Sequence, residues 1–424
     1  MTSHEFTRLL VELAVLLFCA LAGGWFMRRL RQPAVLGEML AGIVLGPTVF
    51  GFFAPEWQDW LFSDGGAAAT VRGGVIKLGM LFFLFVVGLE IDLGQFRKFG
   101  WAAVLIGIIG TAVPLASGVA LVYALPEGML PSRVARLPFG LFIGTALANT
   151  ANPVLARILI DLGLFKQNLG AMLMTATIVD DLVSWSLVAV ILEMFTSPGE
   201  TPRYGSVPGS LALVALFLVA AIVVGRYVAT PLLKITRRGT WPTSFIGVTA
   251  VLVLAAAAAA EYMGIHAFLG PFLLGIGMAA TPRERSEAHE VLNQFALSFF
   301  VPIYFVSMGL TADFVADFDW RWVAAILVVA CASKIVSVYA AARTAGLDNR
   351  TSLGVGMAMN ARGATGIILA GVGLEHGVVD RPIYVALVIM ALVTTLMAGP
   401  MIKWALRVPS ESLTGADRPG VGDY

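Results

Sequence analysis

Long apolar stretches alternate with short polar segments along the whole chain, and this pattern predicts a bundle of membrane-spanning helices. A helix needs about 20 apolar residues to cross a bilayer core of about 30 Å. On that basis the sequence contains thirteen candidate spans. They cover about residues 8–27, 35–53, 74–91, 100–124, 138–160, 168–194, 210–233, 243–262, 265–280, 292–310, 321–343, 351–374 and 382–406. We therefore expect an all-α polytopic membrane protein, a single transporter-like unit over 1–406, with a short tail at 407–424.

Composition supports this class, because 58% of the residues are hydrophobic and only 13% are charged. A soluble protein built from buried helices would need polar faces on most helices, and the spans lack them. Cys19 and Cys331 fall within apolar spans and are most simply small hydrophobes. The sequence shows no metal-ligand cluster, nucleophile triad or cofactor fingerprint. We therefore expect a protein that is not an enzyme and that has neither a cofactor nor a nucleic-acid partner.

The distribution of basic residues predicts the orientation of the bundle. Lys and Arg collect in cytoplasmic loops of membrane proteins. With thirteen spans, the alternate loops that include Arg28, Arg29, Arg237 and Arg238 carry more basic residues than the opposite set. This asymmetry places the N-terminus outside and the C-terminus in the cytoplasm. A bacterial inner (cell) membrane is the expected location.

Two short strings recur in the same order in the two halves of the chain. The string at 36–43 resembles that at 269–276, and 88–92 resembles 309–313. The copies lie seven spans apart, so they would cross the bilayer in opposite senses. We therefore predict two inverted six-span repeats, about 8–194 and 243–406, joined by a linking span at about 210–233.

Three ionisable residues lie within apolar spans. Asp180 and Asp181 are adjacent in the sixth span, and Lys334 lies in the eleventh. Charged groups at bilayer depth are costly and usually face a water-filled path or one another. These residues are therefore the first candidates for a functional site, with Lys334 as the expected partner in the same cavity. A purely structural ion pair is the alternative for Lys334.

The fifth and twelfth spans, which are counterparts in the predicted repeats, each contain a sequence that favours a break in the helix. The fifth has Asn149, Thr150 and Asn152 before a proline, and the twelfth has Asn360 and Arg362 before Gly-rich sequence. Non-helical backbone survives in a membrane only where it is buried in protein or lines a cavity. Two crossed, broken helices would bring like helix ends together, and Arg362 is placed to neutralise the negative ends. A simple proline kink and a Gly-rich packing face are the alternatives.

The chain resembles the monovalent cation:proton antiporter-2 family from about residue 8 to residue 406. The resemblance is carried by the sequences Gln-Pro-Ala-Val-Leu-Gly-Glu at 32–38, Gly-Ile-Val-Leu-Gly-Pro at 42–47, Phe-Val-Val-Gly-Leu-Glu at 85–90 and Thr-Ala-Asn-Pro-Val-Leu-Ala-Arg-Ile-Leu at 150–159. It implies sodium/proton or potassium/proton exchange and a homodimer. It also implies a core domain with two crossed, unwound helices, expected at about 74–194 and 292–406, and a dimerisation or scaffold part at about 8–53 and 210–280.

The resemblance also implies roles for single residues. Asp181 matches the main ion- and proton-carrying carboxylate, and Asp180 the preceding acid of electrogenic members. Lys334 matches the lysine that pairs with that acid, and Thr150 the threonine of the unwound stretch, where Asp181 and Thr150 would bind Na⁺ or K⁺. Many relatives carry apolar residues where this chain has Asn149 and Asn152. The side-chain amide oxygens of these two asparagines are candidate extra ligands for the cation.

The resulting hypothesis is a secondary active antiporter that contributes to pH homeostasis. A carboxylate binds either a proton or a hard alkali cation, so the two compete for one site. Cation entry would ionise Asp181 and disrupt the Asp180–Lys334 pair, so that two protons exchange for one sodium ion. Sodium is the favoured cation, with potassium or lithium as alternatives. A potassium/proton efflux transporter, an organic-cation/proton exporter and, less favoured, an ion channel stay open as other functions.

Overall fold

The computed structural model describes most of the chain. The described residues are 2–30, 32–62, 66–90, 96–131, 135–162, 164–165, 167–196, 216–217, 219–232, 243–263, 267–279, 294 and 296–407. Within these ranges all regular structure is helical, and no strand occurs. The predicted tail beyond residue 407 and the first part of the predicted linking span, 210–215, lie outside the described residues.

The first half of the chain contains both long continuous helices and short ones. Residue 2 starts the first helix through a capping box, because the Thr2 hydroxyl accepts from the Glu5 amide and the Glu5 carboxylate accepts from the Thr2 amide. The helices are α1 (Ser3–Arg29), α2 (Ala34–Leu45), α3 (Phe50–Phe53), α4 (Pro55–Phe62), α5 (Gly66–Glu90), α6 (Phe96–Ala124), α7 (Arg136–Ala148), α8 (Asn152–Asp161) and α9 (Asn168–Thr196), with a 3₁₀ turn at Glu127–Met129.

Aspartate side chains cap three helices of the second half. Asp319, Asp348 and Asp380 accept hydrogen bonds from backbone amides in the first turns of α16, α17 and α19, which satisfies donors that the helix itself leaves unpaired. The helices of this half are α12 (Thr243–Tyr262), α13 (Leu269–Ala279), α15 (Val301–Leu310), α16 (Trp320–Thr344), α17 (Asn349–Ala358), α18 (Gly363–Glu375) and α19 (Arg381–Leu406), and π-helical turns lie at Gly225–Ala229 and Ala296–Phe300.

Seven of the described helices are long and apolar enough to cross a membrane. They are Ser3–Arg29, Ala34–Phe53, Gly66–Leu89, Trp101–Ala124, Asn168–Val188, Trp320–Thr344 and Arg381–Leu406. Shorter apolar helices lie in the other six predicted spans, at Arg136–Ala148, Val219–Leu232, Ile246–Tyr262, Leu269–Ala279, Ser298–Leu310 and Thr365–Glu375. The count of thirteen spans stays a prediction, since several of these helices are too short to cross a bilayer core of about 30 Å alone.

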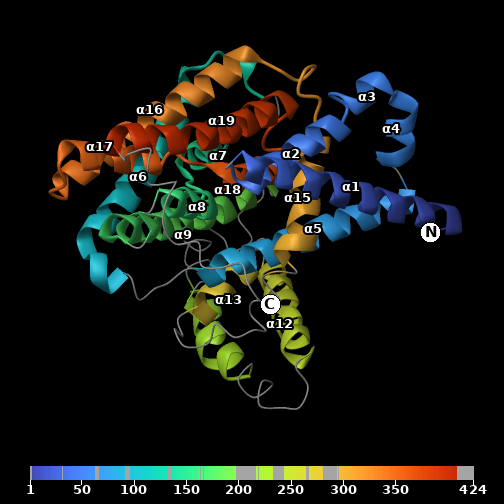
Figure 1. Cartoon of the computed structure of the whole chain (residues 1–424), viewed down its shortest axis with the longest axis horizontal. Coiled ribbons are helices and arrows are strands. Elements are labelled where there is room, and N and C mark those ends of the chain that lie inside the picture. Colours follow the sequence, from blue (N-terminus) through green and yellow to red (C-terminus); the bar gives the residue numbers. More distant parts are fainter. Residues whose placement is uncertain are drawn as a thin grey trace.

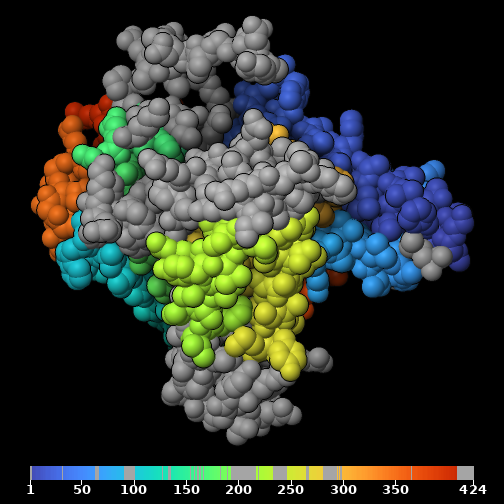
Figure 2. Space-filling model, turned by 90° about the horizontal axis from the view of Figure 1, so that it is seen from below, coloured from blue at the N-terminus to red at the C-terminus, as the bar shows by residue number. Residues whose placement is uncertain are grey.

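Large apolar side chains cover much of the outer surface. Phe18 is 73% exposed and Trp101 is 72% exposed, both on long helices. Figure 2 shows the helix at 243–262 (yellow) and the segment at 219–232 (yellow-green) on one face of the molecule. Val251 and Tyr227, which lie in these segments, are 64% and 67% exposed. A surface of this kind is costly in water and suits contact with lipid acyl chains.

The helices gather into two groups that meet near the middle of the molecule. One group contains α6 to α9 and α16 to α19, and the other contains α1, α2, α5, α12, α13 and α15 (Figure 1). Helices from the two halves of the chain pack together in both groups, α6 against α16 in the first and α5 against α13 and α2 against α15 in the second. Neither group is therefore formed by one half of the chain alone.

Glycines allow the closest helix contacts of the N-terminal segment. At Gly37 in α2, an added Cβ would lie 2.0 Å from the carbonyl oxygen of Gly23 in α1. At Gly42, an added Cβ would lie 2.0 Å from the carbonyl oxygen of Val306 in α15. Backbones that approach so closely have no room for a side chain, so small residues are required at these crossings.

The string at 269–276, which resembles that at 36–43, makes the same kind of contact. An added Cβ at Gly270 in α13 would lie 2.1 Å from the carbonyl oxygen of Ala256 in α12. An added Cβ at Gly275 would lie 2.4 Å from the carbonyl oxygen of Phe85 in α5. In each string, the first glycine therefore packs against the preceding helix, and the second packs against a helix from the other half of the chain.

We predict that Gly42→Ala destabilises the protein, because the added methyl group overlaps the Val306 carbonyl and forces α2 away from α15. Overpacking of this kind costs about 1–3 kcal/mol. Thermal unfolding of the purified protein in detergent measures the loss. Gly399→Ala in α19 is the control, since an added Cβ there meets no atom within 4 Å. Equal melting temperatures for the two variants would contradict the prediction.

Candidate functional site

Two interrupted helices meet in the group formed by α6 to α9 and α16 to α19. Residues 149–151 separate α7 from α8, and residues 359–362 separate α17 from α18. The Ala151 amide donates to the Ala361 carbonyl over 2.8 Å, so the two interruptions lie against each other. Figure 1 shows α7, α8 and α18 near the middle of this group. Both interruptions fall in the segments where the sequence favours a broken helix.

Local sequence explains where these helices stop and start. Asn149 has extended backbone angles, φ −61° and ψ 136°, and ends α7. Gly363 begins α18 with a φ of +40°, in the left-handed region that glycine tolerates best. An added Cβ at Gly363 would also lie 2.4 Å from Cγ2 of Val154 in α8. The Gly363 amide donates to the Thr395 hydroxyl at 2.9 Å, which satisfies the start of α18.

Thr150 joins the first interruption to the second through its side chain. Its hydroxyl donates to the Met359 carbonyl at 2.8 Å, and the residue is fully buried. The hydroxyl proton is therefore used within the protein. The oxygen keeps a lone pair that could serve as a ligand, because a hydroxyl is one donor and two acceptors.

Arg362 satisfies the carbonyl groups around both interruptions. Its guanidinium donates to the Leu147 carbonyl at 2.6 and 3.2 Å, to the Ala330 carbonyl at 2.8 Å, and to the carbonyl and side-chain oxygens of Asn360 at 3.2 and 2.5 Å. All these acceptors are neutral. A fully buried cation thus sits at the C-terminal end of α7, where the helix dipole is negative.

Asp180 and Lys334 form an ion pair that is shielded from solvent. Lys334 Nζ lies 2.9 Å from Asp180 Oδ2, and both side chains are 0% exposed. The same ammonium group donates to the Ala148 carbonyl, the last residue of α7. The other oxygen of Asp180, Oδ1, accepts from the Thr111 hydroxyl in α6 at 2.6 Å. Both oxygens of Asp180 are therefore engaged.

Asp181 has a different environment, although it is the next residue of α9. Its Oδ2 accepts from the Asn152 amide, the first residue of α8, and the Asn149 amide faces the same carboxylate. Its Oδ1 has no hydrogen-bond partner. The residue is completely buried. An ionised carboxylate with one free oxygen is costly in such a place unless a proton or a cation neutralises it.

Further oxygen atoms near Asp181 are also unsatisfied. The side-chain oxygens of Asn149, Asn152 and Ser184 are buried and have no hydrogen-bond partner in the structure. Ser184 lies one helical turn beyond Asp181 on the same face of α9. Unpaired buried polar atoms are rare in folded proteins and call for an explanation. Carboxylate, amide and hydroxyl oxygens are the ligands that hard cations prefer.

The structure brings all the predicted site residues into one neighbourhood and adds two that sequence reasoning missed. Thr111 contacts Asp180, and Ser184 follows Asp181 by one turn. A single Thr or Ser in an apolar span is common, because its hydroxyl can bond its own helix. The only sequence signal for Ser184 is its position three residues after Asp181, and nothing in the sequence indicates Thr111.

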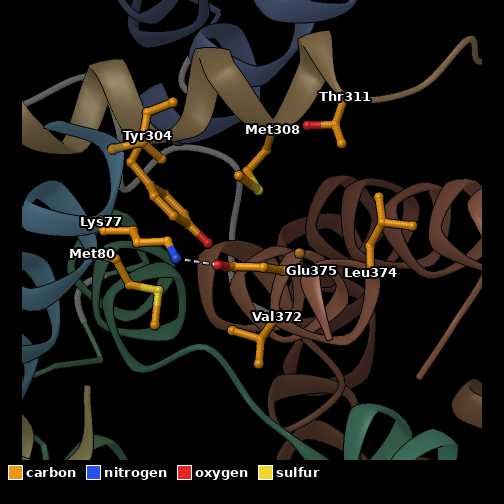
Figure 3. Close-up of a pocket in the computed structure, with 10 residues that line it drawn as sticks. Lys77, Met80, Tyr304, Met308, Thr311, Val372, Leu374 and Glu375 are labelled. Atoms are coloured by element: carbon orange, nitrogen blue, oxygen red, sulfur yellow. Dashed lines mark ion pairs between the residues drawn. The ribbon is translucent and has the colours of Figure 1, made fainter. Parts of the chain in front are cut away.

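A separate cavity of about 150 Å³ lies away from the aspartates, between α5, α15 and α18. Figure 3 shows Lys77 pointing at Glu375 across its mouth, with Tyr304, Met80 and Met308 around the interior. Lys77 Nζ and Glu375 Oε1 are 2.5 Å apart, and both side chains are largely exposed. The pair links the two groups of helices at their surface.

Comparison with known proteins identifies the family to which the chain belongs. Residues 13–408 match the family described as "Sodium/hydrogen exchanger, transmembrane". The chain belongs to the sodium/hydrogen exchanger family. Members are membrane-embedded cation/proton antiporters and not enzymes, so the chain is an integral membrane protein of the transporter class.

Relatives of the sodium/hydrogen exchanger family match along almost the whole chain. The chain is 30% identical to the Na⁺/H⁺ antiporter NhaS4 of Synechocystis over 413 residues, which cover 95% of the chain and 98% of that protein. It is 30% identical to cation/H⁺ antiporter 17 of Arabidopsis thaliana over 98% of the chain, but it spans only 50% of the length of that relative. The fold resembles that of the sodium proton antiporter MjNhaP1 from Methanocaldococcus jannaschii, with a TM-score of 0.67 at 16% identity, covering 97% of the chain and 100% of that structure.

We predict that Arg362→Met lowers stability strongly, since it leaves buried carbonyl oxygens of Leu147 and Ala330 without donors. Each unsatisfied buried acceptor costs about 1–3 kcal/mol. Thermal unfolding in detergent measures the effect. Arg343→Met is the matched control, because Arg343 is exposed and donates to a single carbonyl, that of Leu347. A melting temperature for Arg362→Met as high as that of the control would refute this role.

Proposed function

We propose that the protein exchanges a monovalent alkali cation for protons by alternating access, with Asp181 as the shared binding site. The observation that supports this most directly is the free Oδ1 of Asp181, which is buried beside the unpartnered side-chain oxygens of Asn149 and Asn152. A proton or a hard cation would satisfy the same oxygen, and the two would therefore compete. Competition for one site produces exchange.

The charges around the site favour a monovalent cation. Lys334 balances Asp180 directly, and Arg362 is bonded to the carbonyls at the negative end of α7. Of these four buried charged residues, Asp181 is then the one whose charge has no compensating partner. One proton or one alkali cation neutralises it, whereas an empty ionised site would be expensive to move through a low-dielectric barrier. We propose sodium as the preferred cation, with potassium or lithium as the alternatives.

The Asp180–Lys334 pair supplies a mechanism for electrogenic exchange. We propose that cation entry at Asp181 disrupts this pair and that proton entry restores it, so that two protons move against one cation. The direct contact of the pair at 2.9 Å and its burial support this coupling, because a change of charge at the neighbouring residue acts on it with little screening. An exchange of unequal charge would respond to the membrane potential.

The packing supports an arrangement of two inverted six-span repeats, with thirteen spans in all. The two similar strings use their glycines in equivalent contacts, α2 with α1 and α15, and α13 with α12 and α5. The sequence-based division placed α5 and α15 in the core domain. Their packing against α13 and α2 favours the scaffold instead, and we propose that the core consists of α6 to α9 and α16 to α19. A homodimer in a bacterial inner membrane, with the N-terminus outside, completes the proposal.

We predict that Asp181→Asn abolishes exchange, since an amide can neither release a proton nor carry the charge that a cation neutralises. The assay is cation-driven proton movement in proteoliposomes. Asp348→Asn is the control, because this exposed residue caps α17 and asparagine caps helices about as well. Full activity in Asp181→Asn would remove the residue from the exchange site.

Lys334→Gln is expected to retain some transport but to move less net charge per cycle, because the ammonium group that pairs with Asp180 is gone. Solid-supported-membrane electrophysiology on reconstituted protein, with sodium, potassium and lithium jumps at several pH values, reports the charge and the preferred cation together. Lys77→Gln is the matched control, since its ammonium pairs with Glu375 at the surface. An unchanged charge per cycle in Lys334→Gln would show that its ion pair is structural only.

A further inference from the structure

We propose that Thr111 is a positioning residue that fixes Asp180 in its pair with Lys334 and so leaves the cation to Asp181. This inference rests on the proposed exchange function. It explains why two adjacent, equally buried carboxylates have different partners. Thr111 itself is 1% exposed and lies in α6, outside the two interrupted helices.

The position of Thr111 follows from the close packing of α6. An added Cβ at Gly107 would lie 2.7 Å from the carbonyl oxygen of Ala176 in α9. An added Cβ at Gly110 would lie 2.9 Å from Cγ2 of Val338 and 3.9 Å from the ammonium group of Lys334 in α16. These glycines let α6 lie against both α9 and α16. The next residue, Thr111, is thereby carried to the place where Asp180 meets Lys334.

The hydrogen bonds of Thr111 point to a preference for Asp180. Its hydroxyl oxygen lies 2.6 Å from Asp180 Oδ1 and 2.8 Å from the carbonyl oxygen of Gly107. A hydroxyl has only one proton to donate. Hydrogen bonds to a carboxylate are shorter and roughly twice as strong as those between neutral groups, so the Thr111 hydroxyl donates to Asp180 and not to the Gly107 carbonyl. An ordinary helical threonine would give it to the carbonyl four residues earlier.

As a consequence, the Asp180 carboxylate is fixed in orientation by bonds on both oxygens, whereas the Asp181 carboxylate keeps one oxygen without a bond. Asp180 is held at Oδ1 by Thr111 and at Oδ2 by Lys334, with Asp181 and Arg362 as the other charged groups close to it. Without the Thr111 hydroxyl, Asp180 Oδ1 would become a second free carboxylate oxygen beside the cation site. It would then be able to turn toward the cation, which would bind more tightly and leave more slowly.

Thr111→Val tests this role with little change of shape. We expect turnover to fall about tenfold and the KM for the cation to fall with it, because a charge-assisted hydrogen bond is lost and an extra ligand is gained. Thr111→Ser should restore both values. Thr394→Val is the matched control: Thr394 is equally buried, and its hydroxyl lies 2.8 Å from the carbonyl four residues earlier, that of Met390. It should exchange like the unmodified protein.

A double-mutant cycle separates this inference from the proposed function. Thermal unfolding of Thr111→Val, Asp180→Asn and the double variant in detergent should give non-additive shifts, because the two residues share one hydrogen bond. Additive shifts, failure of Thr111→Ser to rescue, or kinetics of Thr111→Val equal to those of Thr394→Val would each overturn the positioning role. If the unmodified protein exchanges no alkali cation, the proposed function fails, and the unfolding cycle still decides whether Thr111 holds Asp180.

Discussion

The backbone carbonyl groups that α7 leaves without a helical partner at its end are the constraint on which the rest of the candidate site depends. A helix that stops inside a membrane leaves backbone acceptors that water cannot reach. Here Arg362 donates a hydrogen bond to the Leu147 carbonyl, and Lys334 donates one to the Ala148 carbonyl. Satisfying a broken helix thus requires two buried cations, and buried cations are tolerable only near negative charge. The aspartates of α9 and the negative end of α7 supply that charge, so the break in the helix and the ionisable cluster stabilise each other.

Within this cluster, Asp180 and Asp181 carry the same side chain and differ in their hydrogen-bond partners. Asp180 is engaged on both oxygens by groups from α6 and α16, whereas Asp181 accepts from the Asn152 amide at the start of α8 and keeps one free oxygen. These bonds hold Asp180 in its pair with Lys334. The proposed ion site rests on the open lone pair of Asp181 and on the unpartnered amide oxygens of Asn149 and Asn152, which are oxygen ligands of the kind that hard cations prefer.

The sequence is sufficient for the helical class and for the residues that lie together in the candidate site, because apolar length and a charge within an apolar span are local signals. Asp180, Asp181 and Lys334 stood out against their spans, and the prolines, glycines and amides around 149–153 and 359–366 marked the interruptions. Two features were beyond its reach. Thr111 looks like any other threonine in an apolar helix, and its role depends on glycine contacts that bring α6 to α9. The assignment of α5 and α15 to a helix group likewise depends on packing between distant segments, which no local pattern encodes.

The hydrogen bond from Ala151 to Ala361 has a mechanical consequence. Together with the Thr150 hydroxyl on Met359 and the Arg362 guanidinium on Leu147, it fastens the two interruptions to each other at three points. Buried hydrogen bonds resist shear because stretching any one of them leaves unpaired groups. The three contacts couple the two interruptions mechanically, so a displacement of one interrupted helix would carry the other with it.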